Sequence, residues 1–182
     1  MTDLVPQVQL IRVQARLEVQ PRQPVYTQDR LETEKRARVR LELLDGSIVN
    51  LGPRSRFTLA EMDEPTQKAS LLLTHGRLRA EVVRRTRAGG EFVVRTRTAV
   101  VGVIGTMAFV AAGAEETFVA NLSRDFTARI SVRSTDPAIP ELTILKPGYG
   151  TRVSLGAPPD PPRLWEKERI ELALDDSREF RP

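Results

Sequence analysis

Apolar residues alternate with polar or charged ones along most of this chain, and that period of two constrains the fold more than any other feature. From Ile11 to Val19 every second residue is apolar, and the same alternation recurs in residues 39–43 and 78–82. Successive side chains of a β-strand point to opposite faces, so these segments are typical of strands with one buried face. Further segments of this kind are 71–73, 92–94, 118–120, 126–132 and 142–144.

Turn-forming residues separate the alternating segments. They are Asp45-Gly46, Gly52-Pro53, His75-Gly76, Gly89-Gly90, Gly105, Gly113 and Pro147-Gly148. Such spacing predicts an all-β fold of about a dozen short, mostly antiparallel strands. The pattern does not decide between a sandwich, a barrel and a solenoid.

The chain changes character after residue 156. Residues 157–162 read APPDPP, an extended proline-rich spacer, and RLWEKERIELALDD follows. This segment is rich in helix formers, although alternation at its end also allows an added edge strand; we favour a short helix. We therefore divide the chain into a β-domain, 1–156, and a spacer with a helical tail, 157–182. Trp165 carries a large apolar surface, so we expect it to anchor the tail on the β-domain or on a partner.

The segment RTRTAVVGVIGT, residues 95–106, changes from basic to apolar. Arg95 and Arg97 share one strand face, whereas residues 99–104 include no polar side chain. We therefore expect a core strand from Ala99 to Ile104 that is covered on both sides. Gly105 is expected to turn the chain with a positive φ.

Residues that carry chemistry are scarce. The 182 residues include no cysteine and one histidine, His75, which precedes a glycine in an expected turn. A transition-metal site needs a cluster of ligands, and we find neither that nor a nucleophile with its base. We predict no catalytic residues, metal or cofactor, and a protein that is not an enzyme. No apolar stretch is long enough to span a membrane, and residues 1–20 do not resemble a signal peptide.

One charged cluster stands out in a chain of net charge +4. If the strands flanking Gly89-Gly90 form a hairpin, several arginines project from one face. They are Arg77, Arg79, Arg84, Arg85, Arg95 and Arg97. One interpretation is a site for an anionic polymer, a lipid head group or an acidic protein; the other is a solvated face that prevents edge aggregation. Nucleic acid ranks low, because no aromatic side chains for base stacking lie among these arginines.

Four segments, taken in order, resemble the FecR domain over residues 24–154. They are VYTQDRLETEKRARVRLELLDGSIVNLGPRSRFTL, LLLTHGRLRAEV, FVVRTRTAVVGVIGT and LTILKPGYGTRV. TAVVGVIGT is the most specific part. The motif residues that we single out as structural are Asp45, Gly46, Gly76, Thr98, Gly102, Gly105 and Thr106.

This resemblance implies an extracytoplasmic or periplasmic β-domain used for interaction. We expect a non-enzymatic module for binding or assembly in the bacterial envelope, with a protein or an anionic polymer as partner. The alternative is the periplasmic sensor part of a FecR-type sigma regulator, separated from its membrane helix. The oligomeric state stays open.

Overall fold

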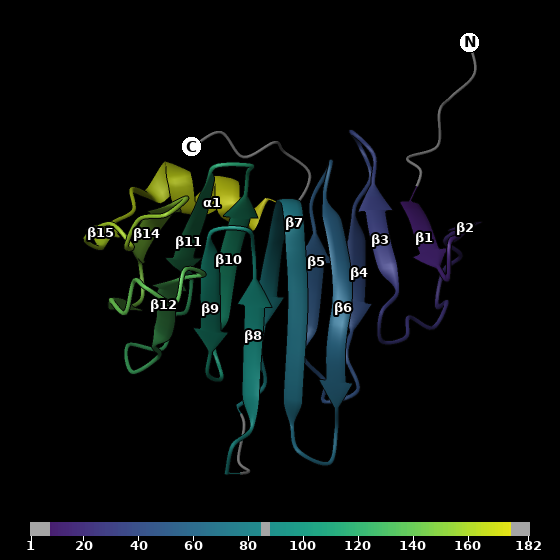
Figure 1. The fold of residues 1–182 in the computed structure, drawn as a ribbon, viewed down its shortest axis with the longest axis horizontal. Helices are drawn as coiled ribbons and strands as arrows, with labels where there is room; N and C mark the ends of the chain where they lie inside the picture. The colour runs from purple at the N-terminus through teal and green to yellow at the C-terminus, as the bar shows by residue number, and fades with distance from the viewer. Residues whose placement is uncertain (1–7, 85–87, 176–182) are drawn as a thin grey trace.

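The computed structural model describes residues 8–84 and 88–175. In this part of the chain, fifteen strands form one continuous hydrogen-bonded network that is folded into two layers and does not close (Figure 1). The expectation of an all-β fold with a short C-terminal helix is confirmed, and its architecture is an open sandwich.

The first layer has the strand order β13-β12-β9-β8-β7-β6-β3-β1-β2. Its strands are β1 (Val8–Arg12), β2 (Ala15–Glu18), β3 (Arg30–Thr33), β6 (Arg56–Asp63), the first half of β7 (Lys68–Glu81), β8 (Glu91–Arg95), β9 (Ala99–Val103), β12 (Ile130–Ser134) and β13 (Leu142–Leu145). All neighbours are antiparallel except β7 and β8, which run parallel.

The second layer has the order β4-β5-β7-β10-β11-β14-β15. It contains β4 (Val39–Glu42), β5 (Ile48–Leu51), the second half of β7, β10 (Met107–Ala112), β11 (Glu116–Asn121), β14 (Tyr149–Ser154) and β15 (Arg163–Leu164). The helix α1 (Lys167–Leu174) lies against the outer side of this layer (Figure 1). It is too short to span a membrane, and it is the only helix in the described residues.

β7 passes from one layer to the other at Gly76. Residues up to His75 pair with β6 and β8, and residues from Gly76 onward pair with β5 and β10. Gly76 has a φ of +92°, which other residues rarely adopt, and a β-carbon at this position would overlap Ser55. The Ser55 hydroxyl bonds with the backbone of Gly52 and Arg77, so this serine fixes the crossing point.

The core lies between the two layers. The largest fully buried side chains include Phe57, Leu71 and Phe92 from the first layer and Leu51 and Leu78 from the second. Burying this much apolar surface is the main favourable contribution to folding.

Several local expectations are wrong. The segment expected over residues 126–132 is a strand only from Ile130, and Phe126 is 87% exposed in a turn. The segment from Ile11 to Val19 is a hairpin, because Val13 and Gln14 turn with positive φ, and the buried residue is Leu10. β9 is covered on one side rather than two, and Ile104 is 64% exposed. In β13, Leu145 points inward and Leu142 outward, the reverse of the expected register. A turn or a one-residue shift reverses which side chains face the core.

Candidate functional site on the outer face of the second layer

The C-terminal segment docks on the outer face of the second layer through an apolar cluster. Trp165 is 6% exposed and packs with Phe109, Ala120, Leu122 and Ala173. Its backbone N–H donates to the Gly148 carbonyl oxygen at 2.9 Å. A β-carbon at residue 150 would overlap the indole of Trp165, so Gly150 leaves the space that the ring occupies.

Two arginines of β7 bind the end of α1. Arg77 donates to the Asp175 carbonyl oxygen at 2.9 Å, and Arg79 to that of Leu174 at 3.3 Å. The last carbonyls of a helix have no partner within it and carry a partial negative charge, which cations stabilise. α1 has no basic residue in its last turn, so β7 supplies the positive charge from another part of the chain.

Arg169 of α1 connects the tail to the aromatic side chains. Its guanidinium lies 4.3 Å from the ring centre of Trp165 and 5.6 Å from that of Phe118. Burial lowers the pKa of Arg169, because it disfavours the charged form. Cation–π contacts of this kind are stronger where water is excluded.

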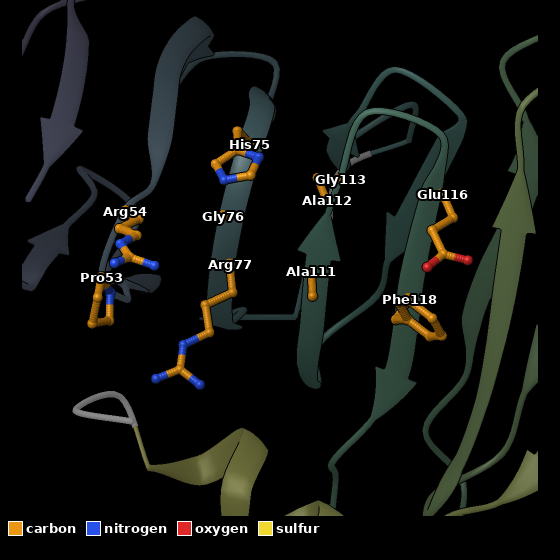
Figure 2. Close-up of a pocket in the computed structure, with 10 residues that line it drawn as sticks. All are labelled: Pro53, Arg54, His75, Gly76, Arg77, Ala111, Ala112, Gly113, Glu116 and Phe118. Atoms are coloured by element: carbon orange, nitrogen blue, oxygen red, sulfur yellow. The ribbon is translucent and has the colours of Figure 1, made fainter. Parts of the chain in front are cut away.

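A hollow of about 270 Å³ lies next to the docked segment, and Figure 2 shows the residues around it. Small side chains on β7 and β10 leave the space, and Phe118 of β11 lines one side. Its polar side chains are those of Arg54, His75, Arg77 and Glu116. In Figure 2, Arg77 reaches from β7 toward α1. This chemistry suits a protein segment that presents apolar groups with a carbonyl or carboxylate oxygen.

Among the arginines that the structure describes, the expected common face does not form. β8 runs parallel to β7, so Gly89-Gly90 does not join two strands of a hairpin. Arg77 and Arg79 lie on the outer face of the second layer, alternating with the core residue Leu78. Arg95 follows the core residue Val94 and lies on the outer face of the first layer, on the opposite side of the sandwich.

Two further arginines of that prediction, Arg84 and Arg97, lie in segments between strands. Arg97 is exposed in the turn before β9, and Arg84 is exposed and packs beside Gly105. Arg85 lies outside the described residues.

The residues matched to the family motif lie at turns and between the layers. The Asp45 carboxylate accepts bonds from the N–H and hydroxyl of Ser47, and Gly46 and Gly105 have φ values of +81° and +55°. Between the layers, the hydroxyls of Thr98 and Thr117 lie 2.8 Å apart, and Thr98 donates to the Val153 carbonyl oxygen at 3.0 Å. Gly102 faces Ser131, and the hydroxyl of Thr106 lies 3.5 Å from the side-chain oxygen of Asn121.

Sequence reasoning missed Phe109 and Phe118. Both lie on strands whose other face contributes Val110 and Val119 to the core. Aromatic residues on the outward face were therefore the available signal that something covers this face. Within residues 8–84 and 88–175, no cluster of three metal-binding side chains occurs.

An open β-sandwich with its own C-terminal segment bound to one face defines an all-β protein whose surfaces suit recognition of other chain segments. A family model described as "FecR protein" matches residues 29–123. The chain belongs to the FecR family.

Solved structures share this fold. Two crystal structures, at 1.65 and 2.50 Å, of a protein from Parabacteroides distasonis ATCC 8503 that is provisionally described as an anti-sigma factor superpose with TM-scores of 0.63 and 0.64. Each is 18% identical, and the alignments cover 80% of this chain. The chain spans 64% and 63% of the length of those chains. No curated protein matches the chain significantly.

Proposed function

We propose that this chain is a non-enzymatic, protein-binding domain of a FecR-type signalling regulator, acting outside the cytoplasm. The observation that carries the proposal is that the outer face of the second layer already binds a protein segment, residues 163–175. It does so through an aromatic cluster and two arginines that bind main-chain carbonyl oxygens.

Family membership supports the regulatory role, since FecR domains are generally extracytoplasmic parts of regulators. The description of the Parabacteroides protein points to the same class. The position of His75 fits a role other than catalysis, because this histidine is exposed at the edge of an open hollow rather than enclosed in a site that excludes water.

The partner that we propose is a protein of the bacterial envelope. An anionic envelope polymer is the second candidate, favoured by the exposed side chains of Arg84, Arg95 and Arg97. The narrower expectation, a module for envelope assembly, stays a prediction, because neither the family model nor the similar solved structures concern assembly.

Deleting the gene in its source bacterium and measuring all transcripts tests the proposal. A signalling regulator predicts that a small set of promoters changes and that the unmodified gene restores them. Re-expression of the Trp165→Ala variant, which alters the outer face of the second layer, tests whether that face takes part in the signalling. An unchanged set of transcripts would contradict a signalling role, and an envelope defect without any transcriptional change would favour assembly instead.

A further inference from the structure

The two layers have different widths on the side of the N-terminal hairpin. Beyond β7 the first layer continues through β6, β3, β1 and β2, whereas the second continues only through β5 and β4. Figure 1 shows β1 and β2 extending past β4. Neighbouring strands lie about 4.8 Å apart, so the second layer lacks the width of a strand or two on this side.

A cavity of about 890 Å³ occupies this side of the sandwich. The first layer contributes apolar side chains such as Leu31 and Leu59, and β4 contributes Val39 and Leu41. Residues 19–27 form the remaining wall. Known ligand clefts have volumes of roughly 300–1,000 Å³, so this one can hold a ligand.

The loop of residues 19–27 does not take the place of a strand. Its described backbone makes no hydrogen bond with β4. It is held instead by the first layer: Arg12 lies 4.5 Å from the ring centre of Tyr26, and the Tyr26 N–H donates to Asp29 at 2.8 Å. Asp29 in turn binds Arg12 through two hydrogen bonds.

The free edge of β4 presents backbone donors and acceptors to this cavity. The Leu43 N–H donates to the Ser47 carbonyl oxygen, which makes residues 43 and 47 a hydrogen-bonded pair. Hydrogen-bonded and non-bonded pairs alternate between antiparallel strands, so Leu41 and Val39 also bond to β5. The N–H and C=O groups of Arg40 and Glu42 therefore point away from β5. Among the described residues, no strand pairs with this edge.

The side chains of β4 divide in the same way. Val39, Leu41 and Leu43 face the core side and line the cavity. Arg40 and Glu42 are exposed on the outer surface, with opposite charges two residues apart. A strand laid beside β4 would place alternate side chains in the cavity and the others next to these two charges.

We propose that the β4 edge receives an extended segment of a partner protein, which adds one antiparallel strand to the second layer. This inference rests on the proposed protein-binding function and names the class of partner. The segment has apolar residues at alternate positions. Between them it carries an acidic residue opposite Arg40 and a basic residue opposite Glu42. Main-chain bonds supply the affinity, and the apolar side chains fill the cavity.

A second copy of the chain does not fit this edge. Antiparallel pairing of β4 with the same strand of another copy places both first layers on the same side of the joined sheet. Each first layer extends past β4 by its β1–β2 hairpin, so the two hairpins would occupy the same space. A single extended segment avoids this overlap.

The test uses the purified chain and a fluorescein-labelled peptide with the core Val-Lys-Val-Glu-Val. Arg40→Pro removes one outward N–H without touching the bonds to β5, and proline is tolerated at the outward positions of edge strands. Arg40→Ala removes the same charge and keeps the N–H. In fluorescence anisotropy we expect the affinity of Arg40→Pro for the peptide to fall about tenfold or more, because one hydrogen bond is lost and a steric conflict is added. The affinity of Arg40→Ala should fall by less than about threefold.

A second pair of peptides keeps the test decisive if Arg40→Pro does not fold. Methylating the backbone nitrogens of the lysine and glutamate should abolish binding to the unmodified chain, and methylating the central valine should not. Absence of binding, equal losses for both Arg40 variants, or equal effects of both methylations would overturn the proposal. So would a dimer in sedimentation that Arg40→Pro dissociates. Failure here leaves the transcript test of the signalling function unaffected, because that test involves no peptide.

Discussion

Trp165 packs edge-to-face against Phe109, with ring centres 5.9 Å apart and an angle of 67° between the ring planes. The contact joins the C-terminal segment to a central strand of the second layer. It converts the proline-rich spacer from a free linker into a connection with both ends held. Edge-to-face pairs contribute about 0.5–1.5 kcal/mol beyond the area that they bury.

Trp165→Ala should therefore release the tail. We expect the free energy of unfolding to fall by about 3 kcal/mol, as for other buried aromatic residues replaced by alanine. The amides of α1 should exchange faster with solvent. Urea denaturation and hydrogen exchange measure the two effects. Leu164→Ala is the matched control, because Leu164 is 67% exposed. Equal effects of the two variants would contradict the anchoring role.

Gly76→Ala should be strongly destabilising. A β-carbon at this position would overlap the Oγ and Cα atoms of Ser55, and the φ of +92° adds backbone strain. Together these effects should lower the free energy of unfolding by more than about 3 kcal/mol. Gly89→Ala is the control: Gly89 has a φ of +79°, but no atom lies within 4 Å of its added carbon. The free energy of unfolding of Gly89→Ala should fall by only about 1 kcal/mol. Thermal unfolding of both proteins would show whether the difference exists.

Stability should fall as the pH drops below about 4, in part because of Asp29. The hydrogen bonds from Arg12 lower the pKa of the Asp29 carboxyl below its value in the unfolded chain. A lowered pKa in the folded state contributes stability above the unfolded pKa, and this contribution disappears as the pH falls through the folded one. Asp29→Asn should make the acid limb of the stability curve shallower. Asp160→Asn, in an exposed ion pair, should change that limb less. Equal slopes in denaturation at stepped pH would count against the Arg12–Asp29 contribution.

The arginines predicted from the sequence should separate into two groups. Arg77→Gln should lower the free energy of unfolding by about 1–3 kcal/mol, since the buried guanidinium binds the end of α1. Arg95→Gln combined with Arg97→Gln should change it by less than about 0.5 kcal/mol, because both side chains are exposed. If these two bind an anionic partner, the double variant should elute earlier from heparin, with a weaker dependence on salt. Unchanged retention would mean that they form only a solvated surface.

Much of the fold of this protein could be predicted from local patterns in the sequence. The alternation of apolar residues and the spacing of the turns predict an all-β fold, because side-chain direction in a strand depends only on position along it. The helix formers after the proline-rich spacer predict the short α1. The TAVVGVIGT segment carries the family resemblance, and its threonine and glycine positions lie where the layers and turns need small or hydroxyl side chains.

What the tertiary structure alone decided is which strands are neighbours. β7 crosses between the layers and pairs in parallel with β8, so Arg77 and Arg95 lie on opposite faces although both occupy exposed-looking strand positions in the sequence. The unequal widths of the layers, and with them the free edge of β4 above an apolar cavity, follow from the same pairing choices. Pairing between strands distant in sequence depends on the total apolar surface that the assembled layers bury. A local sequence pattern does not determine that total.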